Sequence, residues 1–125
     1  MRVTRLDRGQ AAPDSSPIFI GTALRQGVVA EGDANQLRVN SVTFVDGARN
    51  HWHRHGADQV LVVTEGRGIV ASESQEFELS PGDVVLVPAG ERHWHGAVPG
   101  SDFSHLSILT PGELIIEDEG VAGRS

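Results

Sequence analysis

The chain has 125 residues, with ten Lys and Arg against seventeen Asp and Glu, which gives a formal net charge of 10 − 17 = −7. This length predicts one domain with its own hydrophobic core. The absence of cysteine excludes disulfides, thiolate metal sites and a cysteine nucleophile. The acidic charge disfavours nucleic-acid binding, and no apolar run approaches the roughly 20 residues of a membrane-spanning helix. Because charged residues stand where a secretion signal would need an apolar segment, we expect a soluble cytoplasmic protein.

The order of short β-branched runs and turn residues along the chain predicts an all-β sandwich or barrel. Residues 1–36 are weakly patterned, and we expect either an arm or edge strands that pack on a partner subunit. Glycine and proline, fifteen and six in number, then punctuate the runs and mark turns between them. The expected strands are 18–21, 37–45, 59–64, 68–72, 76–79, 84–87, 93–97 and 104–109.

The sequence after Pro111 is rich in Asp and Glu, and we expect residues 111–125 to be a solvated acidic tail. No boundary or tandem repeat divides the chain. The prediction is therefore a single domain over residues 1–125, with the barrel itself spanning residues 37–110.

All six histidines lie between residues 51 and 105, in two clusters and one isolated position. Because side chains alternate faces along a strand, His53 and His55 share one face, and His93 shares a face with His95. Two imidazoles on one face can hold the same metal ion. Any single histidine could instead be solvated or satisfied by a hydrogen bond, as we expect for His51, but the clustering favours a metal site.

The two clusters also carry motifs with fixed spacing. Gly47, His53, His55, Gln59 and Gly66 follow G-x5-H-x-H-x3-E-x6-G, with glutamine in the glutamate position. The second cluster follows G-x5-P-x-G-x2-H-x3-N, with alanine in the asparagine position; its residues are Gly82, Pro88, Gly90, His93 and Ala97. In these motifs the chain resembles the cupin superfamily of small metal-binding proteins, at that family's own spacings.

The resemblance implies a cupin-type antiparallel β-barrel of the jelly-roll kind, a homodimer, and a metal ion held by His53, His55, Gln59 and His93. The residues after the second motif are similar to those of the manganese-dependent bacterial cupin hydroxynitrile lyases. In that group two further histidines lie in the pocket, and they correspond here to His95 and His105.

The glutamine is informative about chemistry. Three neutral imidazoles and an amide leave a divalent ion with its full charge, which favours Lewis-acid work over oxidative chemistry with O₂. A Gln59 that is not a ligand and merely begins a strand is the alternative. Manganese is the metal that the resemblance implies, but iron, nickel, zinc and cobalt also suit such donors.

His95 is the candidate general base, because an imidazole titrates near neutral pH. His105 is the candidate for holding or protonating the leaving group, unless it is a rim histidine without a role. Asn40 and Val42 share one face of the strand 37–45, which lines the pocket mouth if the resemblance holds. Leu109 departs from the lyase pattern, in which a glutamine is expected, and makes the pocket more apolar.

Three functions remain open on these grounds. The first is a metal-dependent lyase that acts on a small molecule and resembles hydroxynitrile lyase. The second is a metal-dependent dioxygenase or other cupin oxygenase, which requires Fe(II) and O₂. The third is a non-catalytic accessory cupin that binds a small molecule without turnover and leaves His95 and His105 without a task.

Overall fold

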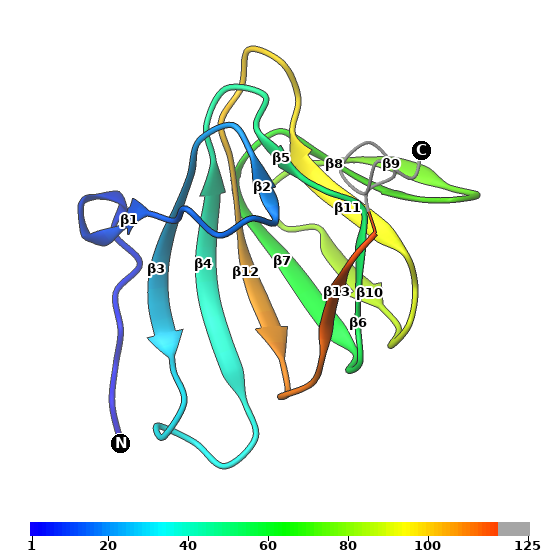
Figure 1. Ribbon diagram of the computed structural model, residues 1–125. Helices are drawn as coiled ribbons and strands as arrows, with labels where there is room; N and C mark the ends of the chain where they lie inside the picture. The colour runs from blue at the N-terminus through cyan, green and yellow to red at the C-terminus, as the bar shows by residue number, and fades with distance from the viewer. Residues whose placement is uncertain (118–125) are drawn as a thin grey trace.

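The computed structural model describes residues 1–117, and the regular elements of this part are almost all β-strands (Figure 1). A single turn of 3-10 helix, η1 (Arg8–Gln10), precedes the strands. Within the described residues no helix is long and apolar enough to cross a membrane.

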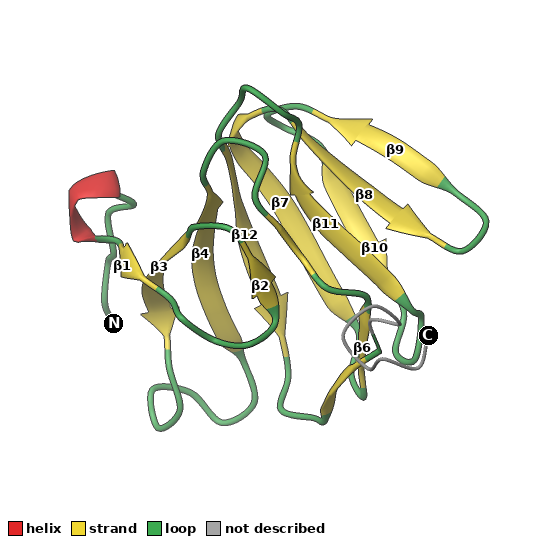
Figure 2. Ribbon diagram, turned by 45° about the horizontal axis from the view of Figure 1, so that its top comes forward, coloured by secondary structure: helices red, strands yellow, loops and turns green. Residues whose placement is uncertain are grey.

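Two antiparallel sheets face each other and enclose the interior of the molecule (Figure 2). The first sheet has six strands, in the order β1 (Ala12–Pro13), β3 (Ala23–Val29), β4 (Arg38–Phe44), β12 (Phe103–Leu109), β7 (Gln59–Gly66) and β10 (Val84–Val87). The second sheet has seven strands. Five follow the order β13 (Leu114–Ile116), β6 (His53–His55), β11 (His93–Ala97), β5 (Arg49–Asn50) and β2 (Phe19–Ile20), while β8 (Gly68–Ser72) pairs with β11, and β9 (Glu76–Leu79) pairs with β8.

Alternation of side chains decides which residues face inward. Along β7 the residues Gln59, Leu61 and Val63 are buried, whereas Val60 and Val62 between them are only half-buried. The same two-residue period places β-branched side chains on both faces of a strand, where they pack well. Every strand expected from the sequence has a counterpart in the structure, with ends that differ by a few residues.

Strands also form outside the expected limits of the barrel, 37–110. Of the two alternatives expected for residues 1–36, an arm or edge strands, the structure has strands: β1 is at the edge of the first sheet, β3 lies between β1 and β4 and contributes the buried Ala23, and β2 is at the edge of the second sheet. Residues 111–125 are not wholly a solvated tail, because Leu114–Ile116 pair with His53–His55 as β13. Ile115 and Ile116 are half-buried by this pairing, which removes apolar surface from water. Residues 118–125 of the expected tail lie outside the described part of the chain.

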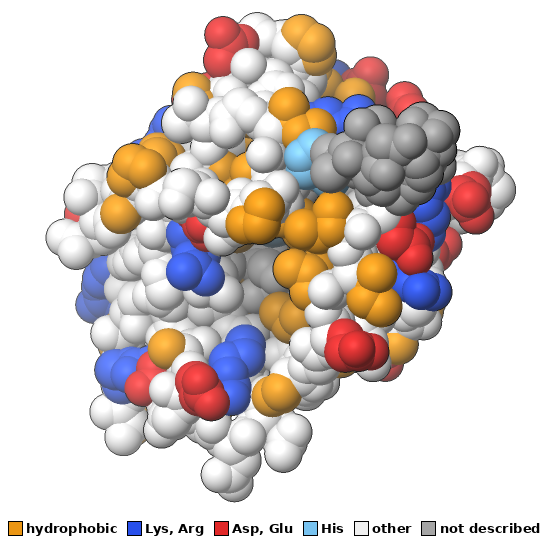
Figure 3. Space-filling view, viewed as in Figure 1, with side chains coloured by type: hydrophobic (Ala, Val, Ile, Leu, Met, Phe, Trp, Pro, Cys, Tyr) orange, Lys and Arg blue, Asp and Glu red, His pale blue; other side chains and the backbone are white. Residues whose placement is uncertain are grey.

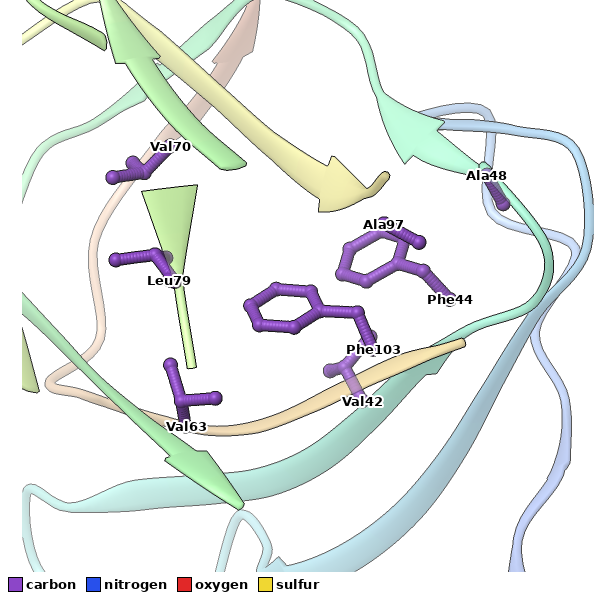
Figure 4. Packing of buried hydrophobic residues seen from close by; sticks show 8 residues of the cluster. All are labelled: Val42, Phe44, Ala48, Val63, Val70, Leu79, Ala97 and Phe103. Atoms are coloured by element: carbon purple, nitrogen blue, oxygen red, sulfur yellow. The ribbon is translucent and has the colours of Figure 1, made fainter. Parts of the chain in front are cut away.

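The hydrophobic core packs directly against two histidines. Phe44 and Phe103 are fully buried with ring centroids 6.1 Å apart, and the Phe44 ring lies 5.7 Å from the rings of both His95 and His105. Burial of each phenylalanine contributes roughly 1.5–3 kcal/mol. The cluster shown in Figure 4 consists of Val42, Phe44, Ala48, Val63, Val70, Leu79, Ala97 and Phe103.

Two glycines of the cupin-like motifs allow a direct test of backbone geometry. Gly66 and Gly82 both have positive φ, 75° and 95°, but a Cβ atom at Gly66 would lie 1.9 Å from the Asp102 carbonyl oxygen, whereas Gly82 has open space. We expect Gly82→Ala to cost about 1 kcal/mol of unfolding free energy from the left-handed backbone alone. Gly66→Ala should cost about 3 kcal/mol or more, because the backbone must also move. Urea unfolding measures both, and equal losses would contradict the steric argument.

Candidate metal centre

Three histidines from two neighbouring strands converge. His53 and His55 come from β6, and His93 comes from β11, opposite His53 in the antiparallel pair. One ring nitrogen from each lies within 4.8 Å of those of the other two. The His53 and His93 ring centroids are 4.2 Å apart, and those of His53 and His55 are 5.0 Å apart. These three imidazoles could hold a metal ion.

In two of these rings a hydrogen bond determines which nitrogen is available to bind a metal ion. Nδ1 of His53 donates to the carbonyl of His51 at 2.7 Å, and Nδ1 of His93 donates to the carbonyl of Glu91 at 2.9 Å. Since the proton of a neutral imidazole then resides on Nδ1, each Nε2 keeps its lone pair for a ligand. Nε2 of His93 is buried and makes no hydrogen bond within the described residues.

Gln59 presents its amide oxygen in the same way. Gln59 is 4% exposed on β7, and its Nε2 donates to Oγ of Ser107 at 2.8 Å. Its Oε1 is buried without a hydrogen-bond partner in the part of the chain that is described. A buried oxygen without a partner costs roughly 1–3 kcal/mol. This unsatisfied oxygen and the unsatisfied Nε2 of His93 are the donors that a divalent cation would satisfy, so the residues fit the predicted metal.

Burial keeps these histidines neutral at ordinary pH. Loss of solvation, with the neighbouring His93 as a further cause, lowers the pKa of His53 to about 3 and of His55 to about 4. The pKa of His93 is also lowered by burial. Neutral imidazole is the form that binds metal.

His95 and His105 form a second pair, next to the three converging histidines. His95 follows His93 on β11, with the two rings stacked at a centroid distance of 5.6 Å, as expected for residues on one face of a strand. His105 lies on β12 in the opposite sheet, and its Nε2 is 3.1 Å from Nδ1 of His95. Burial lowers the pKa of His95 well below its usual value and that of His105 to about 4.

A cavity of about 270 Å³ joins these groups between the two sheets. In Figure 3 a hollow opens near the middle of the face shown, and hydrophobic side chains crowd its rim. One charged pair lines the cavity, Arg25 Nε at 3.2 Å from Asp14 Oδ2. Most of the remaining wall is uncharged; it includes Asn40, Val42, Phe44, Asn50, Ser107, Leu109, Leu114 and Ile116, together with His53, His55, Gln59, His95 and His105.

Every predicted site residue except His93 lines this cavity. The His93 ring lies behind this lining, with its centroid 4.2 Å from that of His53. The sequence did not decide which face of the strand 37–45 turns inward. In the structure, the face that carries Asn40 and Val42 lines the cavity. Sequence reasoning missed Asn50 and Ser107, although Ser107 shares the strand face of His105 and alternation would have indicated it. No sequence signal marked Asn50.

The lowered pKa values predict that the metal-free protein is sensitive to acid. In the unfolded chain a histidine titrates near 6.5, whereas folding lowers the pKa of His53, His55 and His105 to about 3, 4 and 4. Between these values the unfolded state binds more protons, so the free energy of unfolding falls as the pH falls below about 6.5 and levels off below the folded-state pKa values. Each of the buried His53 and His105 contributes up to about 1.4 kcal/mol per pH unit within its window. The half-buried His55 contributes less, because solvent screens its charge.

Thermal unfolding of chelator-treated protein measures this effect. We expect Tm to fall steeply from about pH 7 to about pH 5 and to change little above about pH 7.5. A divalent metal ion added at the higher pH should raise Tm, because it binds only the folded chain. A Tm that stays constant between about pH 7 and about pH 5 would contradict the prediction.

The family of the chain follows from comparison with known proteins. Residues 40–108 match the family model of the cupin domain, and the strand order, the facing antiparallel sheets and the converging histidines are those of a cupin jelly-roll barrel. The chain belongs to the cupin family, as the motifs predicted.

Individual relatives differ in activity. The chain is 37% identical over 109 residues to a protein named (R)-mandelonitrile lyase from Granulicella tundricola, with 86% of this chain and 83% of that protein covered. It is 28% identical over 124 residues to an acireductone dioxygenase of Gluconobacter oxydans, covering 85% and 66% of the two chains. Among solved structures, a cupin-like protein of Thermotoga maritima is similar with a TM-score of 0.79 and 34% identity over 86% of each chain.

Proposed function

We propose that this cupin is a metal-dependent lyase that cleaves small 2-hydroxynitriles into a carbonyl compound and hydrogen cyanide. The observation that carries the proposal is that two separate groups of histidines lie side by side between the two sheets, at one cavity. One group has free nitrogens suited to a metal ion, and the other, His95 with His105, is linked by its own hydrogen bond. The similarity to a mandelonitrile lyase supports the same reaction class.

The first group would be His53, His55, His93 and the amide oxygen of Gln59. When bound there, a divalent metal ion would supply Lewis-acid polarisation of the substrate oxygen. We propose manganese, with iron, nickel, zinc and cobalt as alternatives that the same nitrogen and oxygen donors accept. The neutral amide in place of a carboxylate adds no negative charge to the donor set, and this disfavours oxidative chemistry.

The second group would move the proton. Burial keeps His95 neutral, so its Nε2 can accept the proton of the substrate hydroxyl group. The electron pair of the O–H bond then forms the carbonyl, the bond between the carbinol carbon and the nitrile carbon breaks, and cyanide leaves with that bonding pair. The proton passes from His95 to cyanide, which gives hydrogen cyanide and restores the base. His105 stabilises the protonated His95, because its Nε2 accepts a hydrogen bond from Nδ1 of His95.

The cavity walls support an uncharged substrate with an apolar substituent. Val42, Leu109, Leu114 and Ile116 line the cavity, and apolar walls exclude the water that would otherwise solvate the leaving group. Within residues 1–117 the one cation of the lining is Arg25, whose Nε lies 3.2 Å from Oδ2 of Asp14. A carboxylate substrate would have to compete with that ion pair.

Cleavage of mandelonitrile by the metal-loaded protein tests the proposal. The purified chain is freed of metal with a chelator, reconstituted separately with each of the five metals, and assayed for benzaldehyde and hydrogen cyanide from the (R) and (S) enantiomers. We expect cleavage only after reconstitution. If none of the reconstituted samples cleaves either enantiomer faster than the metal-free protein, the lyase proposal for this substrate is wrong.

Oxygenase chemistry is the second candidate, because the acireductone dioxygenases are also similar to this chain. It requires O₂ uptake by the iron-loaded protein, which an oxygen electrode measures with the acireductone substrate. A non-catalytic accessory cupin would instead bind a small molecule without consuming it. The homodimer and the cytoplasmic location stay predictions.

A further inference from the structure

Asn50 makes two hydrogen bonds to one histidine of the proposed proton-transfer pair. It lies on β5, is 3% exposed and lines the cavity. Its Oδ1 accepts from the backbone N–H of His95 at 2.9 Å, and its Nδ2 is 3.2 Å from Nε2 of His95. Neither cupin motif includes this position.

The backbone bond settles which way the amide faces. A backbone N–H can only donate, so the atom of Asn50 that meets it is the oxygen. The NH₂ group therefore faces the His95 ring, and because NH₂ can only donate, Nε2 of His95 must accept. The proton of a neutral His95 is then on Nδ1.

The tautomer of His95 determines that of His105. Nδ1–H of His95 faces Nε2 of His105 at 3.1 Å, so Nε2 of His105 accepts and its proton is on Nδ1, which is buried without a hydrogen-bond partner among the described residues. This arrangement leaves one buried donor unsatisfied. The opposite arrangement would turn a protonated Nε2 of His95 toward the NH₂ group of Asn50. Two buried donors would then face each other, and each donor left without an acceptor costs roughly 1–3 kcal/mol.

We infer that Asn50 is a positioning residue that sets the tautomers of His95 and His105 and keeps Nε2 of His95 as the unprotonated nitrogen. Its importance for catalysis rests on the proposed function, in which that nitrogen accepts the substrate proton. The amide keeps Nε2 of His95 unprotonated before substrate arrives. Because this nitrogen has a single lone pair, the substrate hydroxyl must displace the Asn50 NH₂ group when it transfers its proton. The hydrogen bond from Nδ1 then directs the positive charge of protonated His95 toward His105.

Nitrogen NMR of histidine measures the tautomers without any turnover. The zinc-loaded full-length chain is labelled with ¹⁵N at histidine, zinc being diamagnetic, and the two rings are assigned from His95→Gln and His105→Gln variants. Unprotonated and protonated ring nitrogens have well-separated ¹⁵N shifts. In the wild type we expect Nε2 of both His95 and His105 to be unprotonated. A protonated Nε2 on His95 would overturn the inference at once, whatever the variants do.

Asn50→Asp is the decisive variant. The new carboxylate can still accept from the His95 backbone but can no longer donate to Nε2, so we expect Nε2 of His95 to become protonated. If the lyase activity exists, kcat should fall about 100-fold with little change in KM, since the base is blocked while the cavity is kept. Unchanged tautomers in folded Asn50→Asp protein would contradict the role.

Asn40→Asp is the matched control. It makes the same chemical change on the wall of the same cavity, but Asn40 makes no hydrogen bond to His95 within the described residues. We expect it to leave the tautomers of His95 and His105 as in the wild type. Tautomers that change equally in both variants would mean that added charge, and not the hydrogen bond from Asn50, controls them. The NMR result stands apart from the lyase assay, so failure of either proposal is recognised separately.

Discussion

Replacing His55 by alanine is expected to weaken metal binding at least about 100-fold, because the donor set loses one of three imidazoles that no neighbouring group can replace. His55 is only half-buried, so the variant should fold, whereas the fully buried His53 and His93 carry more of the packing. Metal analysis of the dialysed protein and titration of the metal-free protein with Mn²⁺ or Zn²⁺ measure the loss.

His51→Gln is the control for this prediction. His51 supports the site through its backbone carbonyl, which accepts from His53, and that carbonyl is unchanged when the side chain is replaced. We therefore expect wild-type metal content in His51→Gln. Equal loss of metal in both variants would contradict the assignment of ligands, as would full metal content in His55→Ala.

Replacing His95 by alanine is expected to lower kcat by about 10²–10⁴ while the metal content stays near that of the wild type. Nδ1 of His95 faces His105 and its Nε2 faces Asn50, so neither nitrogen belongs to the converging group of three. Steady-state cleavage of the best substrate, with metal analysis of the same sample, separates a lost base from a lost metal ion.

Trp94→Phe provides the comparison, because Trp94 adjoins His95 on β11 but stacks under Arg49 at 3.8 Å. It should retain most of the activity. An His95→Ala variant that is as active as Trp94→Phe would remove His95 from the mechanism, and loss of metal from His95→Ala would mean that it supports the metal site instead.

The two groups of histidines explain how one small barrel can hold a metal ion and a separate base. The three converging rings lie on β6 and β11 of one sheet, whereas His105 lies on β12 of the other. Because His95 shares a strand face with His93 on β11, it lies close to the donor set, while its hydrogen bond to His105 connects it to the opposite sheet. Among the described residues that line the cavity, Asp14 is the one carboxylate, and it is paired with Arg25.

The C-terminal strand shows what the sequence could not reveal. The acidic composition after Pro111 indicated a solvated tail, but Glu117 forms ion pairs with Arg54 and Arg92, and the apolar residues before it cover β6. Composition averages over such a segment, whereas the pairing depends on an open strand edge that exists only in the folded barrel. No sequence signal therefore indicated that Leu114 and Ile116 line the cavity.

By itself the sequence determined the properties that depend on neighbours along the chain. Turn residues and β-branched runs defined the strands, and the two-residue period placed His53 with His55 and His93 with His95, because alternation is a local consequence of strand geometry. Only the tertiary structure decided which faces turn inward and which polar groups meet. Asn50 contacts His95 across 45 residues and Gln59 contacts Ser107 across 48, and such contacts depend on how the two sheets pack against each other.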